Sequence, residues 1–397
     1  MTTRPLRRSV GAVRKTCAAV LAGVLAAVAA GLGFGGGVPR AAPASGAPAL
    51  SFSIAHVRPA LPARRDTFFS IYPACACGRR TVIGQFSRSD GRLVRTLATI
   101  SVGGGSHVSN AATDARGGMW MAFTAGPALA APGTAGGGPE PNTCMSALVR
   151  FDLRTGAVAT VMRFPASVTL GNAVPSPDGR RVAVLEGGCA TAFFNQHIVV
   201  VDVATGRQIH VGADATPCHS LFKVAWSPDG TRLLFPFGPS SLPRGTHFLP
   251  AGTCQMPQLS RLVVVSALRP SGVRAWRLWK ADPHCSYEAA AFDHTGVAAA
   301  EGCARRGGPF DTNLGPASLV QLDAHGRRLA RFPLAAGFED GDVVRDPLTG
   351  RVLVSEDQPA NSGLSDDQWV FEFDGRGLRT VVRRPALDAT LLLAQPW

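Results

Sequence analysis

Two stretches of this chain have nearly the same sequence, and this repeat restricts the fold more than any other feature. The first contains Ser176-Pro177-Asp178-Gly179, and the second, 51 residues later, contains Ser227-Pro228-Asp229-Gly230. In each copy a short alternating run leads into this tetrapeptide and a β-rich run follows it. Proline presets φ at the first central position of a turn, Asp bonds back to the backbone, and Gly accepts a positive φ. We therefore interpret both copies as hairpin turns of a repeating β-meander, in which Asp178 and Asp229 are structural.

Degenerate copies of the same four-strand unit follow along the rest of the chain. Three begin near Asn110, Ala289 and Asp342, and a partial copy without its first strand starts at "DTFFSIYP". This makes six units of roughly 45 to 65 residues, a period typical of propellers and other repeat folds. No unit has a helical period, which favours four-stranded blades. We predict an all-β, single β-propeller of four-stranded antiparallel blades, six in number with seven as the alternative. Either residues 389–397 or residues 50–57 would supply the missing first strand.

The repeated turn also suggests a family. Ser-Pro-Asp-Gly followed by basic residues or Thr and then an apolar run resembles the TolB-like and WD-repeat-like β-propellers of bacteria. About residues 165 to 280 match this pattern well, and three further units match it in outline. The resemblance implies a propeller fold, but propellers serve as scaffolds, receptors, lactonases, dehydrogenases and peptidase lids. It therefore implies no particular activity.

Residues 1–44 have the pattern of a secretory signal peptide. A positively charged start precedes an apolar run from Cys17 to Phe34, and small-residue cleavage sites follow at Ala44 or Ala47. An uncleaved membrane anchor is the alternative, because the apolar run is just long enough to span a bilayer. We expect residues 45–397 to form the propeller domain of a secreted, extracellular protein, with cell-surface association if the anchor is retained. We expect no membrane contact after cleavage.

The chain is basic, with a formal net charge of +13. The first 44 residues contain six of the basic residues and no acid, so the remainder carries +7. That remainder has no block of like charges and no basic helix with interleaved aromatic residues, which indicates a solvated Arg-rich surface. We therefore expect no nucleic-acid partner, and we expect a monomer.

Eight cysteines remain beyond Cys17, an even number that predicts disulfides in an exported protein. Metal binding is the alternative, and only Cys75 and Cys77 are close enough in sequence to suggest it. Within a unit, the loops before the first strand and after the second lie on the same rim, which predicts the bonds Cys218–Cys254 and Cys285–Cys303. The other four would link neighbouring blades on this rim in a connectivity that the sequence leaves open: Cys75, Cys77, Cys144 and Cys189.

Polar residues recur on the first strand of the units, which would line the central channel. Alignment on the turns places five residues at one level: Asn110, Asn172, Lys223, Ala289 and Asp342. Four of them are polar where a buried strand would prefer Val or Ile. This pattern indicates either a water-filled channel or a ligand site within it.

Glutamate recurs at the end of the second strand, as Glu186, Glu301 and Glu356. Three carboxylates that converge on one rim would bind a hard cation such as Ca²⁺ through oxygen. Salt bridges to the abundant arginines are the alternative.

The sequence favours a non-catalytic binding module. It has no Gly-x-Ser-x-Gly elbow, no His-Glu-x-x-His and no P-loop. Long Gly/Pro-rich loops after the second strands lie on the predicted disulfide-bearing rim, and they are either a binding surface or tolerated decoration. We expect a protein, small-molecule or glycan ligand at this rim and no cofactor other than Ca²⁺. The alternative is a metal-dependent hydrolase or lactonase in the channel, with Glu288, Asn110, Asn172 and Asp342 as ligands.

Overall fold

The computed structural model describes the strands of the unit Gly46–Trp397 and the turns between many of them. The predicted signal peptide, residues 1–44, lies outside the described residues. The described residues are 52–55, 58, 67–73, 80–102, 106–114, 116–125, 144–188, 196–212, 220–221, 223–238, 261–282, 285–303, 317–334, 339–346, 349–357, 367–385 and 391–393.

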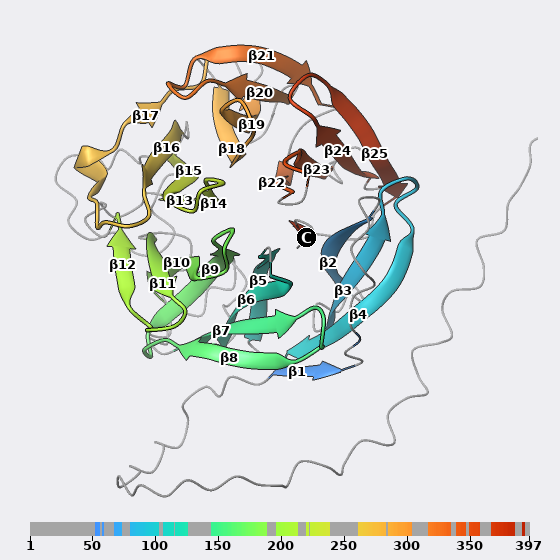
Figure 1. The fold of residues 1–397 in the computed structure, drawn as a ribbon, viewed down its shortest axis with the longest axis vertical. Coiled ribbons are helices and arrows are strands. Elements are labelled where there is room, and N and C mark those ends of the chain that lie inside the picture. The colour runs from blue at the N-terminus through green and yellow to red at the C-terminus, as the bar shows by residue number, and fades with distance from the viewer. Residues whose placement is uncertain are drawn as a thin grey trace, which may run out of the picture. The chain divides into compact units, whose positions relative to one another are not determined.

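Six antiparallel sheets follow one another around a ring, so the chain is a six-bladed β-propeller (Figure 1). The prediction of an all-β fold with six blades is confirmed, and the alternative of seven blades is wrong. Four sheets have four strands in simple meander order. They are blade 2, with β5 (Ser106–Thr113), β6 (Gly118–Ala125), β7 (Met145–Asp152) and β8 (Val158–Arg163); blade 3, with β9 (Val168–Pro175), β10 (Arg181–Gly188), β11 (His197–Asp202) and β12 (Gln208–Val211); blade 5, with β18 (Cys285–Phe292), β19 (Val297–Cys303), β20 (Ser318–Leu322) and β21 (Arg328–Pro333); and blade 6, with β22 (Glu339–Arg345), β23 (Val352–Asp357), β24 (Asp367–Phe373) and β25 (Leu378–Pro385).

Blade 1 joins the two ends of the described unit. Its strands lie in the order β1 (Phe52–Ala55), β4 (Leu93–Val102), β3 (Arg80–Ser87), β2 (Thr67–Pro73) and β26 (Leu391–Leu393). β26 pairs with β2, with Leu393 opposite Phe69, and therefore supplies the missing first strand near the centre of the ring (Figure 1). β1 instead pairs with β4 on the outer edge, with Ile54 opposite Ile100. Of the two predicted sources of the first strand, residues 389–397 are confirmed and residues 50–57 are wrong.

Blade 4 has an interrupted inner strand. β13 (Ser220–Leu221) and β14 (Ala225–Trp226) both pair with β15 (Arg232–Gly238), followed by β16 (Arg261–Ser266) and β17 (Leu278–Trp279). A short 3₁₀ helix, η2 (Val273–Ala275), precedes β17. Within the part of the chain that the structure describes, no helix is long and apolar enough to cross a membrane.

The repeated turns have the structural role that the sequence predicts. The Ser176 hydroxyl donates to Asp178 Oδ1 at 2.6 Å, and Asp178 Oδ1 accepts from the Arg180 backbone N–H at 3.1 Å. Gly179 and Gly230 have φ of 64° and 66°, which side chains other than glycine rarely adopt. The second copy repeats the bonds through Ser227 and Asp229. The carboxylates of both turns are therefore engaged in holding the hairpins.

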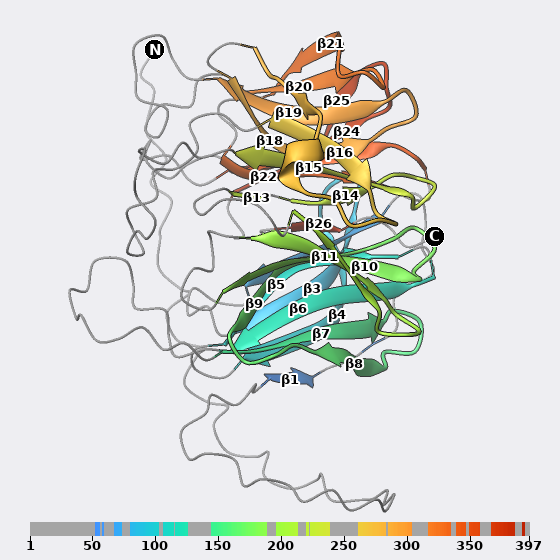
Figure 2. The same cartoon turned by 90° about the vertical axis from the view of Figure 1, so that its left-hand side faces the viewer.

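The core lies between the blades rather than within one of them. Six clusters of buried apolar residues are described, and each joins two neighbouring sheets. Figure 2 shows such neighbouring sheets face to face. Neighbouring blades cover both faces of a sheet. Strands such as β11 ("HIVVVD") are therefore almost continuously apolar, with no alternation of apolar and polar residues. The apolar runs that flank each turn in the sequence thus bury both of their faces.

Candidate functional site

The inner strands are irregular at the level where the sequence predicts the polar ring. In β9 the pairing with β10 shifts so that Asn172 has no partner in the ladder. In β18 the same shift falls at Glu288, and in blade 4 Lys223 lies in the interruption between β13 and β14. A β-bulge re-aims the side chain of the extra residue. These three polar residues therefore lie outside the regular hydrogen-bond ladder, in three consecutive blades.

One member of the predicted ring is misplaced by one residue. Ala289 pairs with Ala300 and is fully buried, whereas Glu288 occupies the bulge of blade 5. The alignment counted back from the turn, but blade 5 pairs one more residue between turn and bulge than blade 3 does. Asn110 lies in the irregular segment of β5, and its side chain is outside the described part of the structure.

Two residues of the ring meet. Lys223 Nζ lies 3.6 Å from Asp342 Oδ1, although these residues belong to blades 4 and 6, which blade 5 separates. The Asp342 side chain is 7% exposed and that of Lys223 is 25% exposed. The long lysine side chain thus connects two blades that are not neighbours in the ring.

The surroundings of Asp342 hold its carboxyl in place. Its backbone N–H donates to Ser355 Oγ at 2.9 Å, and its Oδ1 accepts from the Val343 N–H at 3.2 Å. Burial raises the pKa of Asp342 above its ordinary value, and the Lys223 ammonium partly offsets this effect. Asn172 is buried and Glu288 is half-buried. The inner strands therefore carry one acid–lysine pair, one further acid and one amide, which can bind a polar ligand through both donors and acceptors.

Two of the three glutamates that end the second strands have separate partners. Glu301 is fully buried and lies 2.9 Å from Arg328 and 3.6 Å from Arg331. Glu186 lies 3.7 Å from His197 Nε2. The Glu356 side chain is outside the described residues, and its backbone pairs with Trp369 in the ladder. A shared Ca²⁺ site therefore stays a prediction, while arginine already neutralises Glu301.

One predicted disulfide is present in the described residues. Cys285 and Cys303 are bonded and lie directly opposite each other on β18 and β19. Cys144 is also disulfide-bonded, to a residue outside the described ones. The remaining predicted cysteines lie outside them as well: Cys75, Cys77, Cys189, Cys218 and Cys254. Their pairing, including Cys218–Cys254, stays a prediction.

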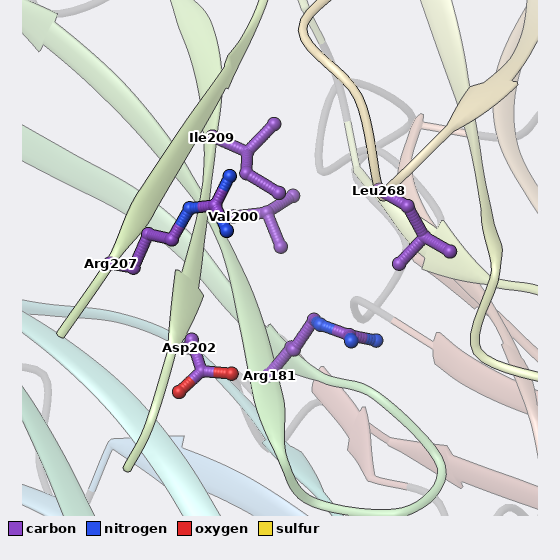
Figure 3. A pocket seen from close by; sticks show the side chains of 6 residues that line it. All are labelled: Arg181, Val200, Asp202, Arg207, Ile209 and Leu268. Atoms are coloured by element: carbon purple, nitrogen blue, oxygen red, sulfur yellow. The ribbon is translucent and has the colours of Figure 1, made fainter. Parts of the chain in front are cut away.

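A pocket of about 210 Å³ lies over the face of blade 3 that meets blade 4, and no described inner-strand residue lines it (Figure 3). The guanidinium groups of Arg181 and Arg207 lie near the apolar side chains of Val200 and Ile209, with Leu268 opposite. Sequence reasoning did not identify this pocket. Its volume is below the several hundred Å³ of ordinary ligand sites, so we do not assign a substrate to it.

Comparison with known proteins does not identify the function. No family model matches the chain, and no curated protein matches it in sequence. Among solved structures, a putative TolB from Agrobacterium tumefaciens is 11% identical, with a TM-score of 0.46 over 84% of this chain and 94% of that one. A calcium-binding protein, regucalcin, from the same organism is 13% identical, with a TM-score of 0.43 over 81% and 93%. An acylaminoacyl peptidase from Pyrococcus horikoshii is 14% identical, with a TM-score of 0.41 over 69% of this chain and only 39% of its own length.

Proposed function

We propose that this protein is an exported, non-catalytic binding module that holds a polar small-molecule, glycan or protein ligand at the centre and the loop-bearing rim of the propeller. The observation that carries the proposal is the Lys223–Asp342 pair, which joins non-adjacent blades 4 and 6 and is largely removed from solvent. Opposite charges fixed in this way recognise a ligand by complementary hydrogen bonds.

The same pair argues against the alternative of a metal-dependent hydrolase or lactonase with its ligands on the inner strands. Asp342 would be one of the anionic ligands of such a metal, with Glu288 as the other. Its carboxylate is instead neutralised by a lysine at 3.6 Å, which a cation would have to displace. Electrostatic repulsion between Lys223 and a divalent ion would oppose that exchange.

Export accounts for the disulfides. Cysteine pairs persist in oxidising compartments and are rare in the reducing cytosol. The Cys285–Cys303 bond and the bonded Cys144 therefore fit the secretory signal that residues 1–44 predict. In this proposal the protein acts outside the cell or at its surface, as a monomer, without contact with nucleic acid.

A ligand screen with matched variants tests the proposal. Purified protein with intact disulfides is screened against a glycan array and a panel of polar small molecules, and hits are measured by titration calorimetry. Lys223→Met and Asp342→Asn should each lower the affinity for the ligand at least about tenfold. A loss of this size corresponds to one charged hydrogen bond. Arg180→Met, in an exposed turn, is the control and should bind like the wild type.

Two outcomes would overturn the proposal. Turnover of an ester or lactone that requires added Ca²⁺ or Zn²⁺ and is lost in Asp342→Asn would establish the hydrolase. Ligand binding that neither Lys223→Met nor Asp342→Asn weakens, in variants that melt as cooperatively as the wild type, would show that the inner-strand residues do not take part.

A further inference from the structure

Three side chains with nitrogen and oxygen ligand atoms meet on one face of blade 3. Glu186 near the end of β10 is directly opposite His197 at the start of β11, and His210 on β12 is opposite Val199. Side chains two residues apart on a strand share a face, so Glu186, His197, Val199 and His210 all project from the same side of the sheet.

Two of the three distances between these groups match those of a metal coordination sphere. His210 Nδ1 lies 3.3 Å from His197 Nε2, and His197 Nε2 lies 3.7 Å from Glu186 Oε1. Zn²⁺ bonds to His nitrogen and carboxylate oxygen are about 2.0–2.2 Å, which places two ligands of a tetrahedral ion about 3.4 Å apart. Two of the three edges of such a site are therefore already close to their final length.

The third edge, between His210 and Glu186, is longer. Among the described residues, one group of three candidate ligands has all its ligand atoms within 4.8 Å of one another, and that group is Cys285, Glu301 and Cys303. Its two sulfurs are joined in a disulfide and its carboxylate is paired with arginines, so it does not compete for a metal. In blade 3 the His210 side chain is exposed, so on metal binding it can exchange its direct contact with His197 for a rotamer nearer Glu186.

The surroundings of the three groups suit a cation. The Glu186 and His197 side chains are 17% and 22% exposed, and a metal would be reached from the exposed His210 side. The carboxylate supplies one negative charge to a bound divalent ion, and the two imidazoles supply nitrogen ligands.

We propose that Glu186, His197 and His210 bind one divalent transition-metal ion, with Zn²⁺ as the representative, and that water completes its coordination. Two imidazoles and one carboxylate are a ligand set that Zn²⁺ and similar ions prefer over Ca²⁺ and Mg²⁺, which favour oxygen alone. The site lies on strands of blade 3 and is independent of the Lys223–Asp342 pair.

Titration of untagged, metal-free protein with Zn²⁺ tests the site. We expect one equivalent to bind by calorimetry, and Co²⁺ to give the intense visible absorption bands of a tetrahedral complex. His210→Ala and Glu186→Gln should each weaken Zn²⁺ binding at least about 100-fold, because loss even of an outer-shell partner costs 10–100-fold. His325→Ala is the matched control, since His325 is an exposed histidine in a turn of blade 5, and it should bind Zn²⁺ like the wild type.

The proposal fails if the wild type binds no Zn²⁺ and no Co²⁺ at stoichiometric concentrations, because the three side chains then form a hydrogen-bonded cluster only. It also fails if His325→Ala weakens binding as much as His210→Ala does, which would indicate non-specific surface binding. His210→Ala removes an exposed side chain, so it should fold as the wild type does, and the thermal melt of the metal-free variant checks this point.

Discussion

Buried charge joins blades 6 and 1 at the interface where the ring closes. Arg88 of blade 1 donates to Glu372 at 2.9 Å and pairs closely with Asp346, both on blade 6. The side chains of these three residues are at most 6% exposed.

Arg88→Met should therefore destabilise the protein far more than an ordinary surface substitution. Glu372 keeps a close contact with Arg351, but Asp346 loses the guanidinium that faces its fully buried carboxylate. Removing one partner of a buried ion pair costs about 3–5 kcal/mol, because the other charge stays buried. The Thr67 carbonyl also loses a donor at 3.0 Å. The expected loss of about 3–5 kcal/mol is a large fraction of a typical free energy of unfolding of about 5–15 kcal/mol.

Urea unfolding, followed by far-ultraviolet circular dichroism, measures this loss. Arg92→Met is the matched control, because Arg92 lies in the same turn, is 82% exposed and is 3.9 Å from Asp90, and it should cost less than about 0.5 kcal/mol. The double variant Arg88→Met/Asp346→Asn removes the buried charge and should recover at least about 1 kcal/mol relative to Arg88→Met. The reasoning is refuted if Arg88→Met lies within 1 kcal/mol of the wild type, or if the double variant is no more stable than the single one.

Three further predictions concern other parts of the fold. Deleting residues 389–397 removes the inner strand of blade 1 and should lower Tm more than starting the chain at residue 58, which removes the outer β1 of that blade. Equal shifts in Tm would contradict the closure that we describe. Replacing Cys285 and Cys303 together by Ser should lower the free energy of unfolding in urea by about 3 kcal/mol, the value expected for a closed loop of this length. Bonds from Ser227 and Thr231 lower the pKa of Asp229 to about 2, so its stabilisation is present above about pH 4 and is lost as the pH falls towards 2. Asp229→Asn should thus cost at most about 1 kcal/mol at pH 7, since the group is exposed, and the difference from wild type in urea should shrink at pH 2; a difference independent of pH would refute it.

The fold was predictable because its signals are local. The turn around Ser176 needs Gly at a positive φ and Asp beside it. The sequence shows these two residues wherever a blade has a similar hairpin. The source of the first strand of blade 1 was not predictable, because residues 50–57 and 389–397 are both short apolar segments. Only the pairing of β26 with β2, across the length of the chain, distinguishes them.

The candidate site was predictable in part. The alignment brought Lys223 and Asp342 to one level, but it could not show that a lysine reaches past blade 5 to a second blade. It also placed Ala289 where Glu288 lies, because counting from a turn assumes that every inner strand has its bulge at the same residue. A bulge adds one residue without changing the local composition, so its position is not visible in the sequence.

The histidine cluster of blade 3 could have been found from the sequence, and the reason it was missed is informative. The turn Asp202–Gly206 fixes the β11–β12 hairpin, so that His210 pairs with Val199 and shares a face with His197. Pairing strand ends in this way, rather than aligning blades, would have placed both histidines on the same face of the sheet as Glu186. Alignment across blades detects residues that every blade needs for its fold. Residues specific to one blade, such as these histidines, are detected only when the strands of that blade are paired with one another, and this is where functions added to a repeating fold are to be sought.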